Sequence, residues 1–166
     1  MSKMYKIGEK LLTLSDISKI LSEGIKIELS SKSEKKVKEC RKYLDEKIKN
    51  SQDPIYGVNT GFGSLCNHKI SDEDLEQLQR NLVVSHACGT GYEVPQDIVK
   101  IMLLLKIQSL SYGHSAVQLQ TINRLIDMFN NNILPVVFQL GSLGASGDLA
   151  PLAHMSLVLL GLGETY

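Results

Sequence analysis

The chain has no net charge and no long uninterrupted apolar run, and each absence excludes a class of function. Eighteen Lys and Arg residues balance eighteen Asp and Glu residues, so there is no basic excess of the kind that binds nucleic acid or an anionic membrane surface. The least charged stretch, 133–163, is interrupted by Asp148, Pro151 and His154, whereas a membrane-spanning helix needs about 20 apolar residues. We therefore predict a protein without nucleic-acid or membrane partners.

The sequence also lacks a disulfide framework and the features of a signal peptide. Cys40, Cys66 and Cys88 are odd in number and widely spaced, which fits reduced thiols better than paired ones. The first residues, Met1 to Lys6, lead into polar sequence without an apolar segment. With 43% apolar and 22% charged residues over 166 positions, the composition predicts a globular cytoplasmic protein with a core large enough for one domain.

Apolar residues recur every three or four positions through most of the chain, which predicts a mainly helical fold. Capping sequences, prolines and glycines mark the expected ends of the helices. Helices are expected from Thr13 to Gly24, from Ser31 to about Ile48, from Ser71 to Gly89, from Pro95 to Gly113, from about Ser115 to Asn131, and from Asp148 to Leu160. Ile25, Ile27 and Leu29 alternate with polar residues and predict a short extended segment at best.

The helical pattern disappears between Asn50 and Ile70, where the sequence contains Tyr56, Asn59, Thr60 and three glycines. A loop of this length within a compact domain is usually functional or disordered. The aromatic residues and closely set glycines favour an ordered, functional loop. Taken alone, Tyr56 would more often be a surface or capping aromatic residue than a catalytic one.

The stretch from Gly141 to Leu152 is the most specific in the chain. It matches neither phosphate-binding glycine motif, and no lysine follows it, so a phosphate site is a weak interpretation. In Ala145-Ser146-Gly147, attack of the glycine nitrogen on the Ala145 carbonyl carbon would close a five-membered ring. Loss of two waters would then give a methylidene-imidazolone, an electrophile whose methylidene carbon comes from Ser146. The tripeptide alone is no evidence for this group, since such residues are common in linkers.

Two Cys and His pairs invite a zinc interpretation, Cys66 with His68 and His86 with Cys88. Residues two apart on a helix point to nearly opposite sides, so His86 and Cys88 cannot share a metal there. We therefore expect no metal.

Three segments together resemble a known family. The segment from Gly141 to His154 resembles the signature of the aromatic amino acid ammonia-lyases, and specifically their histidine branch. The segments Tyr56 to Gly63 and Gln79 to His86 also resemble family segments, in the same order. The resemblance runs from about residue 8 to residue 164.

The resemblance implies a mainly α fold of the ammonia-lyase/aspartase type, with long glycine-containing active-site loops. It implies that residues 1–166 form the N-terminal part of a larger helical ammonia-lyase, without the central helical bundle and the C-terminal part. The resemblance also implies a homo-oligomer, which in the family is a tetramer. We expect the isolated chain to be inactive.

The chemistry that the resemblance implies is non-oxidative elimination of ammonia from L-histidine to give trans-urocanate. Tyr56 would take the β-proton of the substrate, and His86 would bind its imidazole. The electrophile would be the methylidene-imidazolone made from Ala145, Ser146 and Gly147, with no external cofactor. The unpaired N–H groups at the amino end of the helix expected from Asp148 would favour negative charge on that ring.

Two other interpretations stay open at this point. The chain could belong to an ammonia-lyase or aminomutase for another aromatic amino acid, or it could be a non-catalytic helical interaction module. The pair Ser85-His86 resembles the histidine branch of the family. In the phenylalanine and tyrosine branches, the same segment resembles Phe-Leu or His-Leu. Two positions depart from the family pattern: Phe138 stands where proline is usual, and Ala116 where glycine is usual.

The sequence also makes two predictions about packing. His154 is expected to be a core hydrogen-bonding residue rather than a catalyst. The helices from Pro95 and from Asp148 are too apolar to be covered by the remaining short helices, so an exposed apolar patch and self-association are expected.

Overall fold

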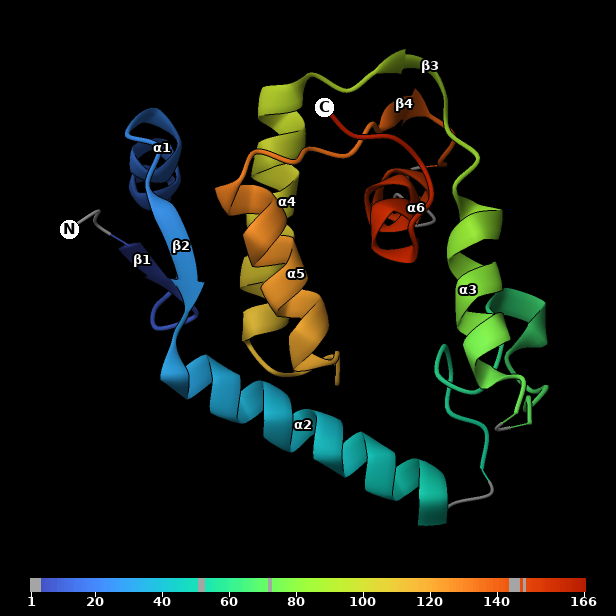
Figure 1. The fold of residues 1–166 in the computed structure, drawn as a ribbon. Coiled ribbons are helices and arrows are strands. Elements are labelled where there is room, and N and C mark those ends of the chain that lie inside the picture. The colour runs from blue at the N-terminus through green and yellow to red at the C-terminus, as the bar shows by residue number, and fades with distance from the viewer. Residues whose placement is uncertain (1–3, 51–52, 72, 144–146, 148) are drawn as a thin grey trace. The chain divides into compact units, whose positions relative to one another are not determined.

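The computed structural model describes residues 4–50, 53–71, 73–143, 147 and 149–166. Helices dominate these ranges, which confirms the mainly helical prediction. The α-helices are α1 (Leu14–Ser22), α2 (Ser31–Asn50), α3 (Leu75–His86), α4 (Gln96–Ser111), α5 (Leu119–Asn130) and α6 (Leu149–Leu157) (Figure 1). The short strands are β1 (Met4–Ile7), β2 (Lys26–Leu29), β3 (Thr90–Glu93) and β4 (Phe138–Leu140), and two 3-10 turns are η1 (Gly63–Leu65) and η3 (Val158–Leu160).

The chain divides into two compact units. Unit 1 comprises Met1–Lys49, Pro95–Leu134 and Tyr166, and unit 2 comprises Asn50–Val94 and Pro135–Thr165. The two active-site loops of the predicted lyase both fall in unit 2.

In unit 1, α4 and α5 pack side by side as an antiparallel pair (Figure 1). Their apolar faces form the core, because burying a large aliphatic side chain contributes about 1.5–3 kcal/mol. The fully or almost fully buried side chains of this pair include Val99, Leu103, Leu104, Ile107, Ile122, Leu125 and Phe129.

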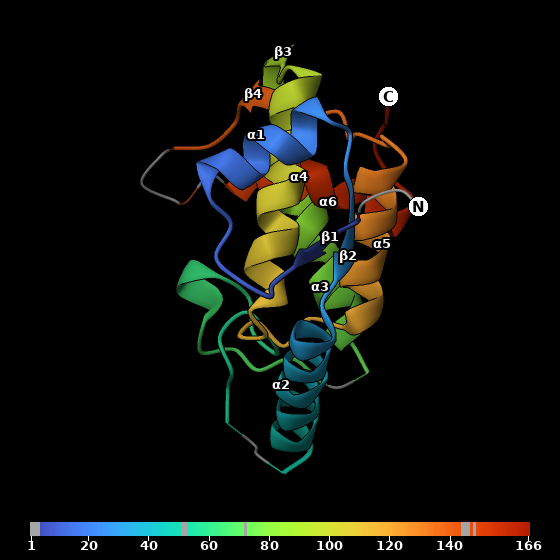
Figure 2. The same ribbon diagram turned by 90° about the vertical axis from the view of Figure 1, so that its left-hand side faces the viewer.

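A parallel pair of strands, β1 and β2, joins this core (Figure 2), with Met4 opposite Lys26 and Ile7 opposite Leu29. At the end of α5, the side-chain amide of Asn130 accepts from the Ile27 N–H and donates to the Ile27 carbonyl, both at 2.8 Å. An asparagine side chain thus makes the two hydrogen bonds that a further strand would make with β2.

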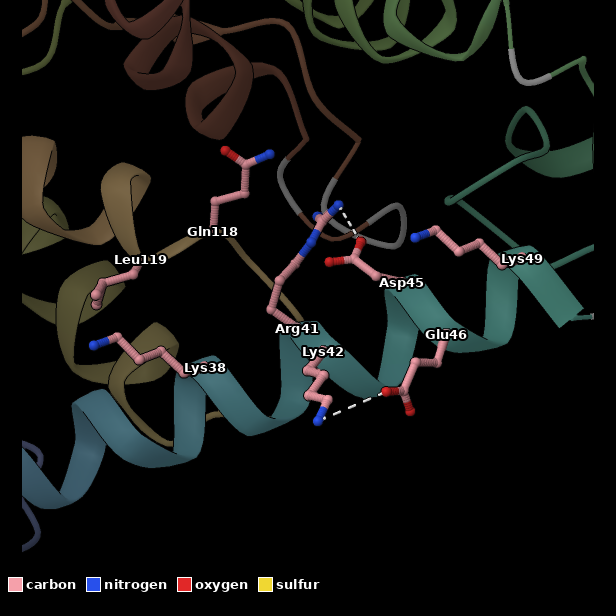
Figure 3. A pocket seen from close by; sticks show the side chains of 8 residues that line it. All are labelled: Lys38, Arg41, Lys42, Asp45, Glu46, Lys49, Gln118 and Leu119. Atoms are coloured by element: carbon pink, nitrogen blue, oxygen red, sulfur yellow. Dashed lines mark ion pairs between the residues drawn. The ribbon is translucent and has the colours of Figure 1, made fainter.

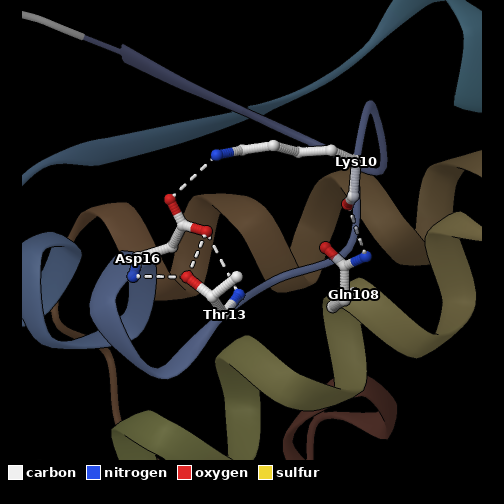
Figure 4. Close-up of polar contacts among 4 residues, drawn as sticks. All are labelled: Lys10, Thr13, Asp16 and Gln108. Atoms are coloured by element: carbon white, nitrogen blue, oxygen red, sulfur yellow. Dashed lines mark hydrogen bonds and ion pairs between the residues drawn. The ribbon is translucent and has the colours of Figure 1, made fainter.

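The amino end of α1 is closed by the predicted capping sequence (Figure 4). The Asp16 N–H donates to Oγ1 of Thr13 at 3.1 Å, and Oδ2 of Asp16 accepts from the Thr13 hydroxyl at 2.7 Å and the Thr13 N–H at 3.1 Å. These hydrogen bonds from Thr13, with a further one from Lys10, lower the pKa of Asp16 to about 2. The start of this helix was predictable because every partner in the capping box lies within three residues.

Unit 2 pairs α3 with α6 and β3 with β4. The two strands are antiparallel, with Thr90 opposite Leu140 and Glu93 opposite Phe138. The Val94 N–H extends the pairing by donating to the Val137 carbonyl at 2.7 Å. Among the described residues, no helix has both the length and the apolar character needed to cross a bilayer.

The expected bounds of two helices were wrong in detail. The helix expected from about Ser115 begins at Leu119, and Ala116 before it has a left-handed φ of 51° that interrupts helical geometry. In α3, Ser71 and Asp74 form the expected side-chain pair at 2.8 Å, but the helix begins only at Leu75 and ends at His86, before Gly89. Of the strands in the described ranges, only β2 was placed by the sequence.

The conformation of Ala116 gives a stability prediction. Replacing it with glycine should raise the free energy of unfolding by about 1 kcal/mol, because glycine adopts a positive φ without the clash of a Cβ. Asn132, with φ 54°, provides the matched control: asparagine tolerates this region better than alanine, so Asn132→Gly should gain less. Urea unfolding of the chain measures both changes. An Ala116→Gly variant that is no more stable than the unsubstituted chain would contradict the prediction that the backbone at Ala116 is strained.

Candidate active site

Tyr56 lies in a loop that is held together by its own polar groups. The side-chain oxygen of Asn59 accepts from the Ile55 N–H at 2.6 Å, and the hydroxyl of Thr60 accepts from the Gly57 N–H at 3.2 Å. Both side chains are buried. The loop then closes where the Ile70 N–H donates to the Asn59 carbonyl at 2.8 Å. The described part of this long segment is therefore an ordered turn structure, as its composition indicated.

Tyr56 and His86 both contact the ring of Phe62. The ring centroids of Tyr56 and Phe62 are 5.7 Å apart, and those of Phe62 and His86 are 5.5 Å apart in an edge-to-face arrangement of 73°. A Cβ on Gly57 would lie 2.9 Å from the Phe62 ring, and the φ of Gly57 is +69°, so glycine is required there. The structure thus brings together two predicted site residues that are thirty positions apart in the sequence.

The hydroxyl of Tyr56 accepts a hydrogen bond from the Gly63 N–H at 3.3 Å. The Tyr56 side chain is 61% exposed in this chain. The residue is therefore largely exposed, and its oxygen has a backbone donor beside it.

His86 is held near the end of α3. Its Nδ1 lies 2.6 Å from the Leu82 carbonyl oxygen, with the Ser85 hydroxyl 3.3 Å away. Because a carbonyl only accepts, Nδ1 carries the proton, and Nε2 of the neutral ring is then an acceptor. His86 as a whole is half-buried, so part of its surface is accessible.

Two residues of this cluster were given no role by the sequence. Phe62 links the other two rings, and Gln79 of α3 donates through Nε2 to the Val58 carbonyl at 2.9 Å. The sequence could have indicated a role for Phe62, since it is the aromatic residue between two of the glycines that follow Tyr56. For Gln79 the indication was its spacing: it lies seven residues before His86, which places both residues on the same side of a helix.

The tripeptide Ala145-Ser146-Gly147, which is predicted to form the electrophile, is described only in part. Ala145 and Ser146 lie outside the described residues, so ring formation stays a prediction. Gly147 has a φ of +82°, a conformation that favours glycine. Next to the tripeptide, the Ser142 hydroxyl accepts from the Ala150 N–H at 2.9 Å, which satisfies a donor in the first turn of α6.

The flank of this loop approaches the end of α3 closely. A Cβ on Gly141 would lie 2.8 Å from the Cα of Gly89, and a Cβ on Gly89 would lie 2.7 Å from Nε2 of His154. A side chain on Gly141 would force it away from Gly89, and a side chain on Gly89 would displace the ring of His154. Small residues therefore set the distance between the residues after His86 and the residues before the tripeptide.

His154 is a core hydrogen-bonding residue, as predicted. It is 9% exposed, its Nε2 accepts from the Gly89 N–H at 2.8 Å, and its ring lies edge-on to Phe138 with centroids 5.3 Å apart. Burial lowers the pKa of His154 below its usual value. Phe138, one of the two departures from the family pattern, thus acquires a packing role.

A cavity of about 420 Å³ in unit 1 does not correspond to this cluster. Its described lining comes from α2 and the start of α5, and Arg41 and Lys42 form ion pairs with Asp45 and Glu46 at 2.7 and 3.8 Å (Figure 3). Exposed ion pairs of this kind contribute little to the free energy of folding. Within the described ranges, no group of three or more His, Cys, Asp or Glu side chains could hold a metal ion.

The fold defines the class of protein. Tyrosine aminomutase from Streptomyces globisporus superposes with a TM-score of 0.87 and 31% identity, covering 97% of this chain and 30% of that one. Histidine ammonia-lyase from Trypanosoma cruzi gives a TM-score of 0.82 and 31% identity, covering 98% of this chain and 31% of that one. The helical fold is thus shared with enzymes that remove or shift an amino group.

The family follows from the sequence comparisons. The model of the aromatic amino acid lyases matches residues 12–166, and the chain belongs to that family. Histidine ammonia-lyase from Legionella pneumophila is 46% identical over 164 residues, which are 99% of this chain and 32% of that protein. The chain therefore spans about a third of the length of that relative.

His154 gives a prediction of pH dependence. Its pKa is lower in the folded chain than the usual 6.5, so the unfolded state binds more protons just below that pH, and stability falls as the pH drops below about 6.5. His154→Gln keeps an acceptor near the Gly89 N–H but does not titrate. The free energy of unfolding should decline more between pH 7 and pH 5 for the unsubstituted chain than for this variant, and parallel declines would contradict the assignment.

Proposed function

We propose that this chain supplies part of the active site of a histidine ammonia-lyase, which eliminates ammonia from L-histidine to give trans-urocanate. The observation that carries the proposal is the contact of both Tyr56 and His86 with Phe62, in a chain 46% identical to such an enzyme. A base and an imidazole-binding group must lie close together to act on one small substrate.

Tyr56 is the proposed general base. In its phenolate form, Tyr56 would remove the β-proton of the substrate. The Gly63 N–H, 3.3 Å from the Tyr56 oxygen, would stabilise the negative charge of the phenolate. Tyr56 is largely exposed in this chain, which is consistent with contact between the residue and a substrate.

His86 is the proposed substrate-binding residue. With its Nδ1 proton held by the Leu82 carbonyl, the neutral ring offers Nε2 to the N–H of the substrate imidazole. A benzene ring has no such donor and would leave this acceptor unpaired, so phenylalanine should be disfavoured.

Ala145, Ser146 and Gly147 are the proposed source of the prosthetic group. Gly147, with its left-handed φ and unhindered nitrogen, fits the role of the attacking residue. The methylidene-imidazolone would supply the electrophile that captures the substrate and makes the departure of ammonia possible. No metal or external cofactor is part of this proposal.

The active protein is proposed to have the length of the relatives and to assemble as a homotetramer in the cytoplasm. The apolar side chains Ile98 and Leu105 of α4 and Leu149 of α6 are 38–46% exposed here, which supports burial against further segments or copies. The isolated chain is proposed to be inactive.

A second candidate is an aminomutase or ammonia-lyase for another aromatic amino acid. It is favoured by the similarity of the fold to tyrosine aminomutase, with a TM-score of 0.87. The pair Ser85-His86, which resembles the histidine branch, supports the histidine assignment instead, because the bond to Leu82 leaves Nε2 free to accept from an imidazole N–H. A non-catalytic module is disfavoured by the family match over residues 12–166.

The test replaces Tyr56 with phenylalanine in the full-length protein that carries this chain. The ring contact with Phe62 is retained and the proton acceptor is lost, so turnover of L-histidine should fall by about 100-fold or more. The tripeptide should still become lighter by two waters in this variant. As the control, Ser146→Ala should lose both the mass change and the activity, whereas near-normal turnover by Tyr56→Phe would exclude Tyr56 as the base.

A further inference from the structure

Gln79 lies in the first half of α3, and its side chain reaches the loop that carries Tyr56. Its Nε2 donates to the carbonyl of Val58 at 2.9 Å and to the carbonyl of Gly57 at 3.3 Å. These two residues directly follow Tyr56 in the chain. One side-chain amide therefore holds the peptide groups next to the proposed base.

The same helix carries His86. Seven residues are about two turns, so Gln79 and His86 lie on the same side of α3. His86 is oriented by the Leu82 carbonyl of that helix, and the Tyr56 loop is attached to it through Gln79. The bonds made by Asn59 and Thr60, in contrast, run within the loop. They preserve its shape but do not set its position against α3.

We infer that Gln79 is a positioning residue, which sets the location of the Tyr56 hydroxyl relative to His86 by fastening the loop to α3. The inference rests on the proposed role of Tyr56. Gln79 acts through Tyr56 and takes no part in proton transfer itself. A base displaced by about 1 Å can lose about 100-fold in rate, so a loosened loop should reduce turnover while leaving His86 in place to bind the substrate.

Two variants remove the clamp, which is the pair of hydrogen bonds from Gln79 to the loop, in different ways. Gln79→Glu keeps the shape but replaces the donor with a carboxylate facing two carbonyl oxygens, and Gln79→Met is neutral and donates nothing. The matched control is Gln77→Glu, since Gln77 lies on the same helix and its Nε2 donates to Asn81 at 2.6 Å, within α3. Effects that both Gln79 variants share, and that the control lacks, come from the lost clamp.

In the full-length protein, kcat for L-histidine should fall about ten-fold or more in both Gln79 variants, with KM within about two-fold of normal. Gln77→Glu should leave both constants within about two-fold. In a Tyr56→Phe background, Gln79→Met should cause no further loss of kcat, because the residue through which it acts is already gone. An equal loss in both backgrounds, or no loss in either, would overturn the inference.

Hydrogen exchange of the full-length protein separates this inference from the proposed function. The amides of residues 55–63 should exchange faster in Gln79→Met than in Gln77→Glu, whether or not Tyr56 is the base. Unchanged exchange, with Tyr56→Phe inactive, would overturn the inference alone. Full activity of Tyr56→Phe would overturn the proposed base and, with it, the catalytic consequence of the clamp.

Discussion

The contact of Phe62 with both Tyr56 and His86 is the interaction on which the candidate site depends. It joins a loop to a helix through edge and tilted ring contacts at 5.5 and 5.7 Å, and such contacts between rings contribute about 0.5–1.5 kcal/mol each. The missing Cβ of Gly57 makes room for the Phe62 ring. The buried side chains of Asn59 and Thr60 then preserve the turn that presents it. A chain that lost this packing would keep its helices but would separate the two residues proposed to act on one substrate.

A second close approach organises the other side of unit 2. Gly141 lies too close to Gly89 to carry a side chain, and a side chain on Gly89 would overlap the ring of His154, to which the N–H of Gly89 donates a hydrogen bond. The residues that follow His86 thereby contact those that precede the tripeptide Ala145-Ser146-Gly147 and those of α6. Unit 2 thus links the three family segments through short-range contacts: ring packing at Phe62, the amide of Gln79, and a glycine pair.

Local features were predictable from the sequence, and distant pairings were not. The capping box at Thr13 and Asp16 and the faces of α4 and α5 follow from residues within a few positions of one another. The pairing of β1 with β2, completed by the side chain of Asn130, depends on partners up to 103 positions apart. The late start of α5 reflects the left-handed conformation of Ala116. The comparison with the family showed that glycine is usual at this position, but the apolar periodicity did not predict the interruption. For the site, resemblance supplied Tyr56 and His86, whereas their shared contact with Phe62 and the reach of Gln79 needed the tertiary structure.

The most direct test of the proposed substrate compares kcat/KM for L-histidine and L-phenylalanine in the full-length protein, before and after His86→Leu. The unsubstituted protein should prefer L-histidine. The variant should lose about 100-fold on L-histidine, because the imidazole N–H is left without its acceptor, while its kcat/KM for L-phenylalanine should not fall. A preference of the unsubstituted protein for L-phenylalanine, or equal losses on both substrates, would contradict the account.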